Sequence, residues 1–192
     1  YLQLMKRYGQ LPLITSDLGT NHDYSSDKKA TVSEIAGQIL ADCDAAIATE
    51  DSEAYSYVYR TQQWGMATKA LAQAIRSETA TYVISPLMGD GGYTADQALE
   101  IAADALAKVL SNGYSLWTTA SAGYNAYASY FLYNPEDMRA QDKETIYGGT
   151  RTAVWSSCGV PIVSGSATAG TCPTQELVDA YEMANGKPAI TG

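Results

Sequence analysis

TADQALEIAADALAKVLSNG, residues 94–113, has the clearest helical pattern in the chain. Thr94 followed by Gln97 has the spacing of a capping box, and Gly113 is suited to the left-handed turn that ends a helix. The apolar positions recur at helical spacing and predict a buried stripe of Leu99, Ala102, Leu106 and Val109. The polar positions predict a solvated face of Asp96, Glu100, Asp104 and Lys108. A helix of this kind requires neighbours that cover its apolar stripe.

Two earlier stretches predict such neighbours. Residues 31–48 open with a second capping box, Thr31 with Glu34, and predict a buried stripe of Val32, Ile35, Ile39, Cys43 and Ala46. A further helix is predicted from Met66 to Ile84, where Ser85 and Pro86 end it. Its predicted buried stripe is Ala67, Leu71, Ala74, Ile75 and Tyr82, and its predicted solvated side is Lys69, Gln73 and Arg76.

Three amphipathic helices with alanine-rich stripes predict a mainly α fold, with tetratricopeptide-like helix pairs, irregular loops and a few short strands. Residues 1–30 are predicted to be irregular apart from an extended piece at 11–15. Short strands are predicted at 144–150 and 153–157, and a helix at 122–132. The stretch 173–188 predicts a last helix with a buried stripe of Leu177, Tyr181 and Ala184.

The length of 192 residues predicts one domain over 1–192. Within it, we expect a helical hairpin core at 31–113, an aromatic, loop-rich region at 114–172 and a closing helix and tail at 173–192. No apolar run reaches transmembrane length, and the first residues, YLQLMKRYGQLPL, lack the pattern of a signal peptide.

The formal charge of −9, with 21 acidic and 12 basic residues and no basic cluster, argues against nucleic-acid binding. Cys43 is predicted to be a buried thiol. Cys158 and Cys172 flank a loop of small residues and could pair in an oxidising compartment, although three unpaired thiols fit the odd number equally well.

Catalytic patterns are absent from the sequence. His22, the single histidine, is predicted to be a solvent-facing loop residue, and no common hydrolase, nucleotide or metal motif is present. The acidic groups that could pair for glycoside hydrolysis all lie in polar connections, where solvation is the simpler interpretation. They are Asp23 with Asp27, Glu50 with Asp51 and Glu53, and Glu136 with Asp137. GDGGYTAD lacks calcium-loop spacing, so we expect no catalytic residue, no metal site at Asp90 and no cofactor.

The aromatic residues instead predict a binding surface. The chain has 15 Tyr and three Trp but one Phe. Tyr is suited to partly solvated surfaces, because its hydroxyl needs a hydrogen-bond partner. Trp117, Tyr124 and Trp155 lie among small polar residues, as a polyhydroxylated ligand requires. The candidate glycan-binding residues are Trp155, Trp117, Tyr93, Tyr124 and Arg151. For Tyr124, Tyr127 and Tyr130, one helix face packed on the core is the simpler alternative.

Six segments occur in an order that resembles the SusD/RagB family of outer-membrane nutrient-uptake lipoproteins. They are YGQLPLIT, EIAGQILADCDAAI, RTQQWGMATKALAQAIRSETATYVISP, NGYSL, KETIYGG and PTQELVDAYEMANGKP. Together they span nearly all of the chain, and PTQELVDAYEMANG is the most specific match. Family members are usually much longer, so the resemblance implies a central fragment of such a protein.

The resemblance implies a surface-exposed, lipid-anchored protein of the outer membrane, with the anchor outside this chain. Such proteins capture glycans, or in some members peptides, and deliver them to a SusC-type TonB-dependent transporter. Their ligand sites are variable aromatic clusters, so the resemblance assigns no residue. Two alternatives remain open: a helical-repeat scaffold that binds protein alone, and a peptide-binding member of the same family.

Overall fold

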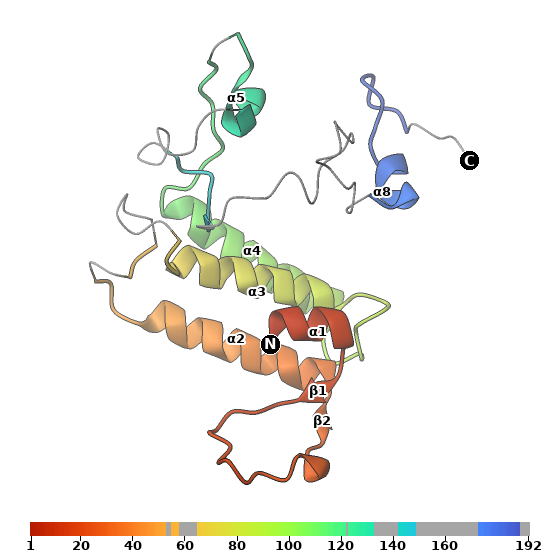
Figure 1. Cartoon of the computed structure of the whole chain (residues 1–192). Coiled ribbons are helices and arrows are strands. Elements are labelled where there is room, and N and C mark those ends of the chain that lie inside the picture. The colour runs from red at the N-terminus through yellow and green to blue at the C-terminus, as the bar shows by residue number, and fades with distance from the viewer. Residues whose placement is uncertain (53–54, 58–64, 122, 133–141, 149–172, 189–192) are drawn as a thin grey trace, which may run out of the picture. The chain divides into compact units, whose positions relative to one another are not determined.

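The computed structural model in Figure 1 describes residues 1–52, 55–57, 65–121, 123–132, 142–148 and 173–188. These residues form a mainly helical structure with six α-helices and a small two-stranded sheet, which confirms the predicted class. The chain divides into two compact units, 1–150 and 151–192. The predicted strand at 153–157 lies outside the described residues, and 144–148 form no strand. No helix of the described residues is long and apolar enough to cross a membrane.

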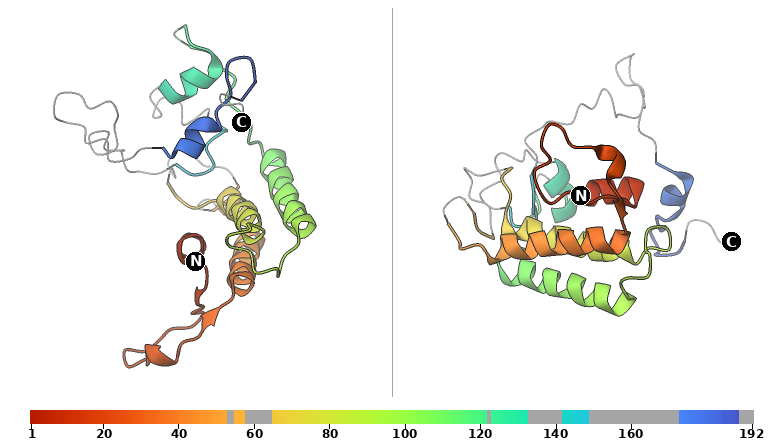
Figure 2. Two further views of the ribbon diagram at one scale, coloured as in Figure 1. Left: turned by 90° about the vertical axis from the view of Figure 1, so that its right-hand side faces the viewer. Right: turned by 90° about the horizontal axis from the view of Figure 1, so that it is seen from below.

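The first unit is built on three long helices that lie side by side. They are α2 (Val32–Ala48), α3 (Lys69–Val83) and α4 (Ala95–Ser111). Successive helices run in opposite directions, and α3 lies between the other two and packs against both (Figures 1 and 2). This central place for α3 decides which of its residues are buried.

Hydrogen bonds from side chains define the starts of all three helices. Thr31 Oγ1 accepts from the Glu34 N–H at 3.2 Å, and Glu34 Oε2 accepts from the Thr31 N–H at 2.8 Å. Thr94 and Gln97 form the same reciprocal pair at the start of α4. Both predicted capping boxes are therefore confirmed. The predicted start of α3 at Met66 is wrong, because Thr68 caps the helix and its first residue is Lys69.

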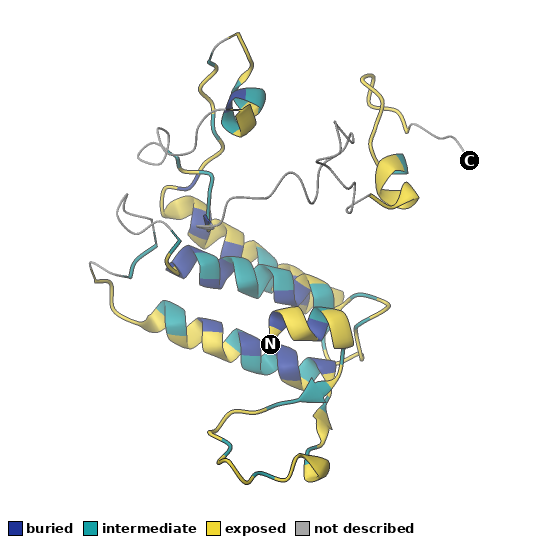
Figure 3. Cartoon of the chain, in the orientation of Figure 1, coloured by how far each residue is buried: buried dark blue, intermediate teal, exposed yellow. Residues whose placement is uncertain are grey.

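The predicted buried stripe of α2 is largely correct, whereas that of α4 is confirmed at Val109 and wrong at Leu99 and Leu106. Val32, Ile35, Ile39 and Cys43 are buried, and Ala46 is half-buried. On α4, Leu99 and Leu106 are exposed, Ala102 is half-buried, and the buried residues are Ala98, Ala105 and Val109. Small side chains permit close approach of helix axes, so α4 turns its alanine face toward α3 and leaves its leucines outside. Figure 3 colours the ribbon by burial.

The predicted solvated side of α3 is also wrong: two of its three residues are buried, and the side chain of Arg76 is only 13% exposed. Lys69 is 6% exposed and Gln73 is fully buried, because α3 has a helix on each flank. The Lys69 ammonium is not left without partners: it donates to the carbonyl of Thr49, at the end of α2, and lies 2.7 Å from Asp51. The residues predicted to form the buried stripe of α3 are more exposed than expected. Ala67 is exposed, and the other four are half-buried: Leu71, Ala74, Ile75 and Tyr82.

Residues 1–30 contain more structure than predicted. A short helix, α1 (Leu2–Tyr8), packs on α2 and α3 and contributes buried Leu2 and Met5 to their core. Lys6 of α1 pairs with Glu78 of α3. The extended piece is confirmed only at β1 (Leu11–Pro12), which pairs antiparallel with β2 (Lys29–Ala30), and a 3-10 turn, η1 (Tyr24–Ser26), lies between them.

The second unit shows a helix at the predicted place but without the predicted core. Thr174 caps α8, which comprises only Gln175–Asp179. Leu177, Tyr181 and Ala184 are all exposed, so the predicted buried stripe is wrong. Residues after the helix turn back through Gly186, whose φ of 75° is readily adopted by glycine, and Glu182 and Pro188 form an isolated bridge.

The connection between α3 and α4 is joined to the start of α2 through Asp90. Its carboxylate accepts hydrogen bonds from the hydroxyl and the backbone N–H of Ser33, and these bonds lower the pKa of Asp90 below its ordinary value of 3.8. Gly92 lies against the same serine, because a Cβ at this position would collide with the Ser33 side chain.

This contact predicts a loss of stability in acid. The unfolded chain binds a proton at Asp90 more readily than the folded one, so the stabilisation is present above the ordinary pKa and is lost as pH falls through the lowered pKa. We expect Asp90→Asn to lower the melting temperature by a few degrees at pH 7 and to flatten its fall below about pH 5. Thermal unfolding between pH 3 and pH 7 measures both effects. Glu50→Gln, at an exposed carboxylate, should change neither; equal pH profiles for Asp90→Asn and the parent protein would contradict the assignment.

Candidate ligand-binding surface

Of the predicted site residues that the structure describes, Tyr93, Trp117 and Tyr124, none is recorded in contact with another. Tyr93 precedes α4, and Trp117 follows it. The 17 residues of α4, a helix about 25 Å long, lie between them in the chain. The Tyr93 hydroxyl lies 3.7 Å from the Cβ position of Gly37 on α2, and its ring packs on the core of the first unit. Tyr93 is therefore a packing residue in this structure. Trp155 and Arg151 lie outside the described residues.

Trp117 is held by two hydrogen bonds in the extended segment after α4. Its backbone N–H donates to Glu144 Oε2 at 2.7 Å, and its indole N–H donates to the carbonyl of Thr119 at 2.8 Å. The neighbouring backbone bond from Ser115 to the carbonyl of Lys143, at 2.9 Å, joins the same two segments. The backbone that carries the indole is therefore held by a later part of the chain, and the indole N–H itself is held by Thr119.

Trp117 and three aromatic residues of α5 (Ala126–Leu132) form a row of neighbouring rings. We call this row the aromatic ladder; in order, it consists of Trp117, Tyr130, Phe131 and Tyr127. The ring centroids of Trp117 and Tyr130 are 6.1 Å apart. Tyr130 meets Phe131 edge-on at 5.4 Å, and Phe131 lies 5.0 Å from Tyr127. These separations are typical of interacting rings. The outer end of the ladder faces water, since Tyr127 and Phe131 are 75% and 64% exposed.

Tyr130 links the ladder to the segment 142–148 through its hydroxyl. The hydroxyl is hydrogen-bonded to Thr145 and lies 3.3 Å from Asp142 Oδ2. Partial burial raises the pKa of Tyr130, and the charges of Asp142 and Glu144 act in the same direction. Asp142 also accepts the backbone N–H groups of Glu144 and Thr145, at 2.9 and 3.1 Å. Its carboxylate is thus engaged in holding this segment.

The alternative of a packed helical face for Tyr124, Tyr127 and Tyr130 is not observed. Tyr124 precedes α5 and is exposed, and Tyr127 is exposed on the helix. The buried residue of α5 is Ser129, whose hydroxyl accepts the Ser121 N–H at 2.9 Å and approaches the Tyr124 carbonyl at 3.3 Å. No aromatic ring among the described residues is recorded against Tyr124, so it lies beside the ladder without joining it.

A small cavity of about 200 Å³ lies beside Trp117 and has a largely polar lining. It is formed by Ser115, Leu116, Trp117, Thr118, Thr119 and Lys143. A larger cavity, about 500 Å³, lies between α1 and the β1–β2 connection and is mostly apolar, with Tyr1 and Tyr24 in its lining. The cavity at Trp117 suits a polyhydroxylated ligand better, because hydroxyl groups and an ammonium group can satisfy sugar hydroxyls that an apolar wall would leave unpaired.

His22, Asp23, Asp27 and Asp51, which were considered for catalysis, have structural partners. His22 is half-buried, contrary to prediction: Nε2 lies 2.7 Å from Asp27 Oδ1, and the ring meets Tyr24 edge-on. Asp23 accepts from the hydroxyl and N–H of Ser25, which lower its pKa. Among the described residues no group of three or more His, Cys, Asp or Glu side chains could hold a metal ion. Glu136 and Asp137 lie outside those residues.

Asp142, Glu144 and Phe131 belong to the site but were not predicted. Asp142 had a local signal, because an aspartate often accepts N–H groups two and three residues later. The contact from Glu144 to Trp117 spans 27 residues, and no local pattern indicates it.

Tyr130→Phe tests the hydroxyl contacts of the ladder. We expect the variant to lose about 1 kcal/mol of unfolding free energy, because the ring remains but its hydrogen bonds to Thr145 and Asp142 do not. Urea unfolding followed by near-ultraviolet circular dichroism measures the loss. Tyr127→Phe is the matched control and should leave stability unchanged, since that side chain is three-quarters exposed. Equal stabilities for the two variants would count against the Tyr130 contacts.

No protein-family model matches the chain, and it matches no curated protein and no solved structure.

Proposed function

We propose that this chain is part of a non-catalytic, SusD-like glycan-capture protein of the outer-membrane surface. It binds an oligosaccharide or polysaccharide and delivers it to a SusC-type TonB-dependent transporter, with its long helices acting as tetratricopeptide-like pairs. A lipid anchor outside this chain holds the protein at the membrane. The order of six family-like segments supports the proposal, as does the aromatic ladder.

The observation that carries the proposal is the surroundings of Trp117. Trp117 lines a largely polar cavity together with Ser115, Thr118, Thr119 and Lys143. A sugar ring has an apolar C–H face and a rim of hydroxyls, so it needs both an aromatic plane and hydrogen-bonding groups around that plane. Trp117 and its neighbours supply both within one short segment.

Binding at this surface requires no proton transfer. The indole contacts the apolar face of the sugar, and the side chains of Thr118, Thr119 and Lys143 exchange hydrogen bonds with its hydroxyls. Glu144 holds the backbone of Trp117, Thr119 accepts its indole N–H and Tyr130 lies beside its ring, which reduces the ordering that the ligand would otherwise impose. A shallow site of this kind is suited to reversible capture and release, as handover to a transporter requires.

Isothermal titration against a panel of neutral and acidic oligosaccharides and of peptides tests the proposal. We expect at least one glycan to bind, and Trp117→Ala to weaken its binding about tenfold, because aromatic contacts of this type contribute on the order of 1 kcal/mol or more. Tyr181→Ala, at an exposed tyrosine of the second unit, is the matched control and should bind normally.

Three outcomes would count against the proposal. A protein that binds no glycan and co-purifies with no transporter would exclude it. Binding of peptides alone would favour the peptide-capture alternative. A soluble protein partner, together with sugar binding that is absent in both the parent chain and Trp117→Ala, would favour a helical-repeat scaffold.

A further inference from the structure

A stripe of exposed leucines runs along α4, on a side that α3 does not cover. Leu99, Leu106 and Leu110 are 68%, 59% and 55% exposed. Spacings of seven and four residues place the three side chains on one face of a helix, at about 100° per residue. Single exposed leucines are ordinary, but three on one face of a 17-residue helix form a continuous apolar surface. We call Leu99, Leu106 and Leu110 the leucine stripe.

The leucine stripe borders a groove between α3 and α4. The groove has a volume of about 290 Å³ and is lined by Gln73, Ala74, Ser77, Glu78, Ala105, Leu106, Val109 and Ile146. Leu106 belongs to both the groove and the stripe. Its neighbours in the groove, Ala74 and Ala105, are small, so they leave room for a side chain inserted from outside. The stripe and the groove together form an apolar seat the length of a helix.

The free edge of this seat is acidic. Asp96 and Glu100 lie on α4 about a quarter of a turn beyond the leucines, on the side away from α3. Both residues are exposed, and no ion pair to either carboxylate occurs among the described residues. Lys108, the basic residue of α4, lies on another side of the helix and is paired with Asp104 at 2.9 Å. The opposite wall has Glu78, whose carboxylate is paired with Lys6. The uncompensated charge at the seat is therefore negative.

This charge argues against a second copy of the chain as the occupant. In a two-fold antiparallel pair of α4 helices, like edges meet, because the same surface serves both copies. Because the two helices run in opposite directions, Asp96 and Glu100 of each copy would lie at opposite ends of that shared edge, which would then carry four carboxylates. The repulsion would add to that between two chains that each carry a charge of −9. An occupant with basic residues beside its apolar seam would instead gain attraction at the end of the edge that carries Asp96 and Glu100.

We propose that the leucine stripe and its groove are a docking site for an amphipathic helix of a partner protein, with leucine-like side chains flanked by Lys or Arg. The site goes beyond glycan capture and uses none of the aromatic ladder. The leucines of the partner insert beside Leu106, and its basic flank pairs with Asp96 and Glu100. Helix-in-groove recognition of this type combines apolar anchors with charges at the rim.

Two synthetic helical peptides of about 18 residues, identical in their leucine seam, provide the test. One has Lys at the flanking positions and the other has Glu. Fluorescence anisotropy with the intact chain should show binding of the Lys peptide that weakens as salt rises, and binding of the Glu peptide at least about tenfold weaker. Leu106→Lys should weaken the Lys peptide about tenfold or more, through loss of apolar contact and added repulsion.

Two variants distinguish binding at the docking site from non-specific binding of the peptides. Leu177→Lys makes the same substitution at an equally exposed leucine of α8 and should leave binding unchanged. The double variant Asp96→Lys, Glu100→Lys should reverse the preference between the two peptides. Circular dichroism checks that each variant is folded. No binding of the Lys peptide, equal binding of both peptides, or a concentration-dependent dimer that Leu106→Lys abolishes would overturn the proposal.

Discussion

Ile35→Ala is expected to lower the unfolding free energy of the helical unit by about 2–5 kcal/mol, the cost typical of a large-to-small change in a packed core. Ile35 is 0% exposed and lies in the cluster that α1, α2 and α3 share, which includes Leu2, Met5, Ile39 and Val83. These neighbours come from separate helices, so they can only partly close the space left by the removed side chain. Urea unfolding followed by far-ultraviolet circular dichroism measures the change.

Leu99→Ala is the matched control, because it removes a similar volume from a leucine that is 68% exposed. We expect it to cost well under 1 kcal/mol, as surface changes usually do. Helical periodicity alone predicts that Ile35 and Leu99 are both buried and hence that both variants are severely destabilised. Equal losses for the two variants would therefore contradict the burial pattern of α4 and, with it, the exposed leucine stripe.

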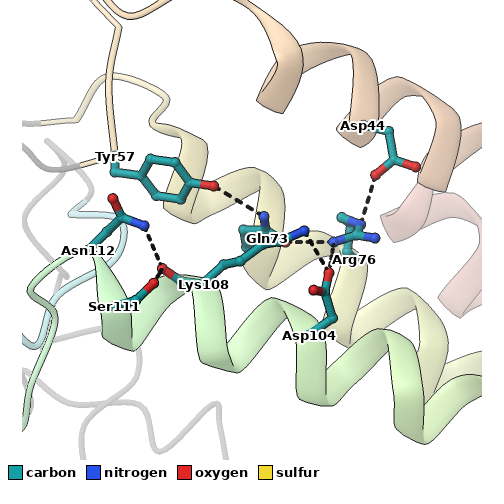
Figure 4. Close-up of polar contacts among 8 residues, drawn as sticks. All are labelled: Asp44, Tyr57, Gln73, Arg76, Asp104, Lys108, Ser111 and Asn112. Carbon is teal, nitrogen blue, oxygen red and sulfur yellow. Dashed lines mark hydrogen bonds and ion pairs between the residues drawn. The ribbon is translucent and has the colours of Figure 1, made fainter.

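Arg76→Met is expected to cost about 2 kcal/mol, because the guanidinium group joins all three long helices (Figure 4). Its Nε lies 3.0 Å from Asp44 on α2 and its Nη1 lies 3.0 Å from Asp104 on α4. Nη1 also donates to Gln73 Oε1 at 2.8 Å. Asp44 and Asp104 are 61% and 44% exposed and can be hydrated again, so losing them costs little. Gln73 is fully buried, and its unpaired oxygen accounts for most of the loss.

Lys108→Met provides the control for Arg76→Met. Lys108 pairs with Asp104 on the exposed side of α4, and such pairs four residues apart contribute about 0.5 kcal/mol or less. The pKa of Asp104 is lowered mainly by the hydrogen bond from Lys108 and next by that from Arg76. The order of the two effects on stability should nevertheless be reversed, because only Arg76 satisfies a buried group. A Lys108→Met loss as large as that of Arg76→Met, in chemical denaturation at moderate salt, would refute this reasoning.

The helix starts were predictable because they depend on neighbours three residues away. Thr31 with Glu34 and Thr94 with Gln97 form capping boxes in the structure, as their spacing indicates. The buried face of α2 was predictable for a related reason, since its apolar residues occupy a single arc. The faces of α3 and α4 were not, because alanine and leucine are both apolar and periodicity does not say which of them faces a neighbouring helix. Close packing on α3 selected the alanines of α4.

In the candidate site too, some residues could be predicted from their neighbours in the sequence and others could not. Trp117 and Tyr124 were predicted from their polar neighbours, and the structure leaves Tyr124 exposed and gives Trp117 a polar cavity. Tyr93 was predicted on the same chemistry but packs on α2 instead. The contacts of Glu144 with Trp117 and of Asp142 with Tyr130 span 27 and 12 residues. Such contacts depend on the path of the chain after α5, and local sequence patterns carry no information about that path.

The amino-acid sequence alone determined the helical class, the caps of α2 and α4 and the polar-aromatic character of the surface, because these depend on side chains within a few positions of one another. Tertiary packing determined that Lys69 and Gln73 are buried between helices, that Leu99 and Leu106 remain outside, and that Trp117 is held by Glu144. Burial of a residue depends on which surfaces meet, and this is a property of the assembled helices rather than of any one segment.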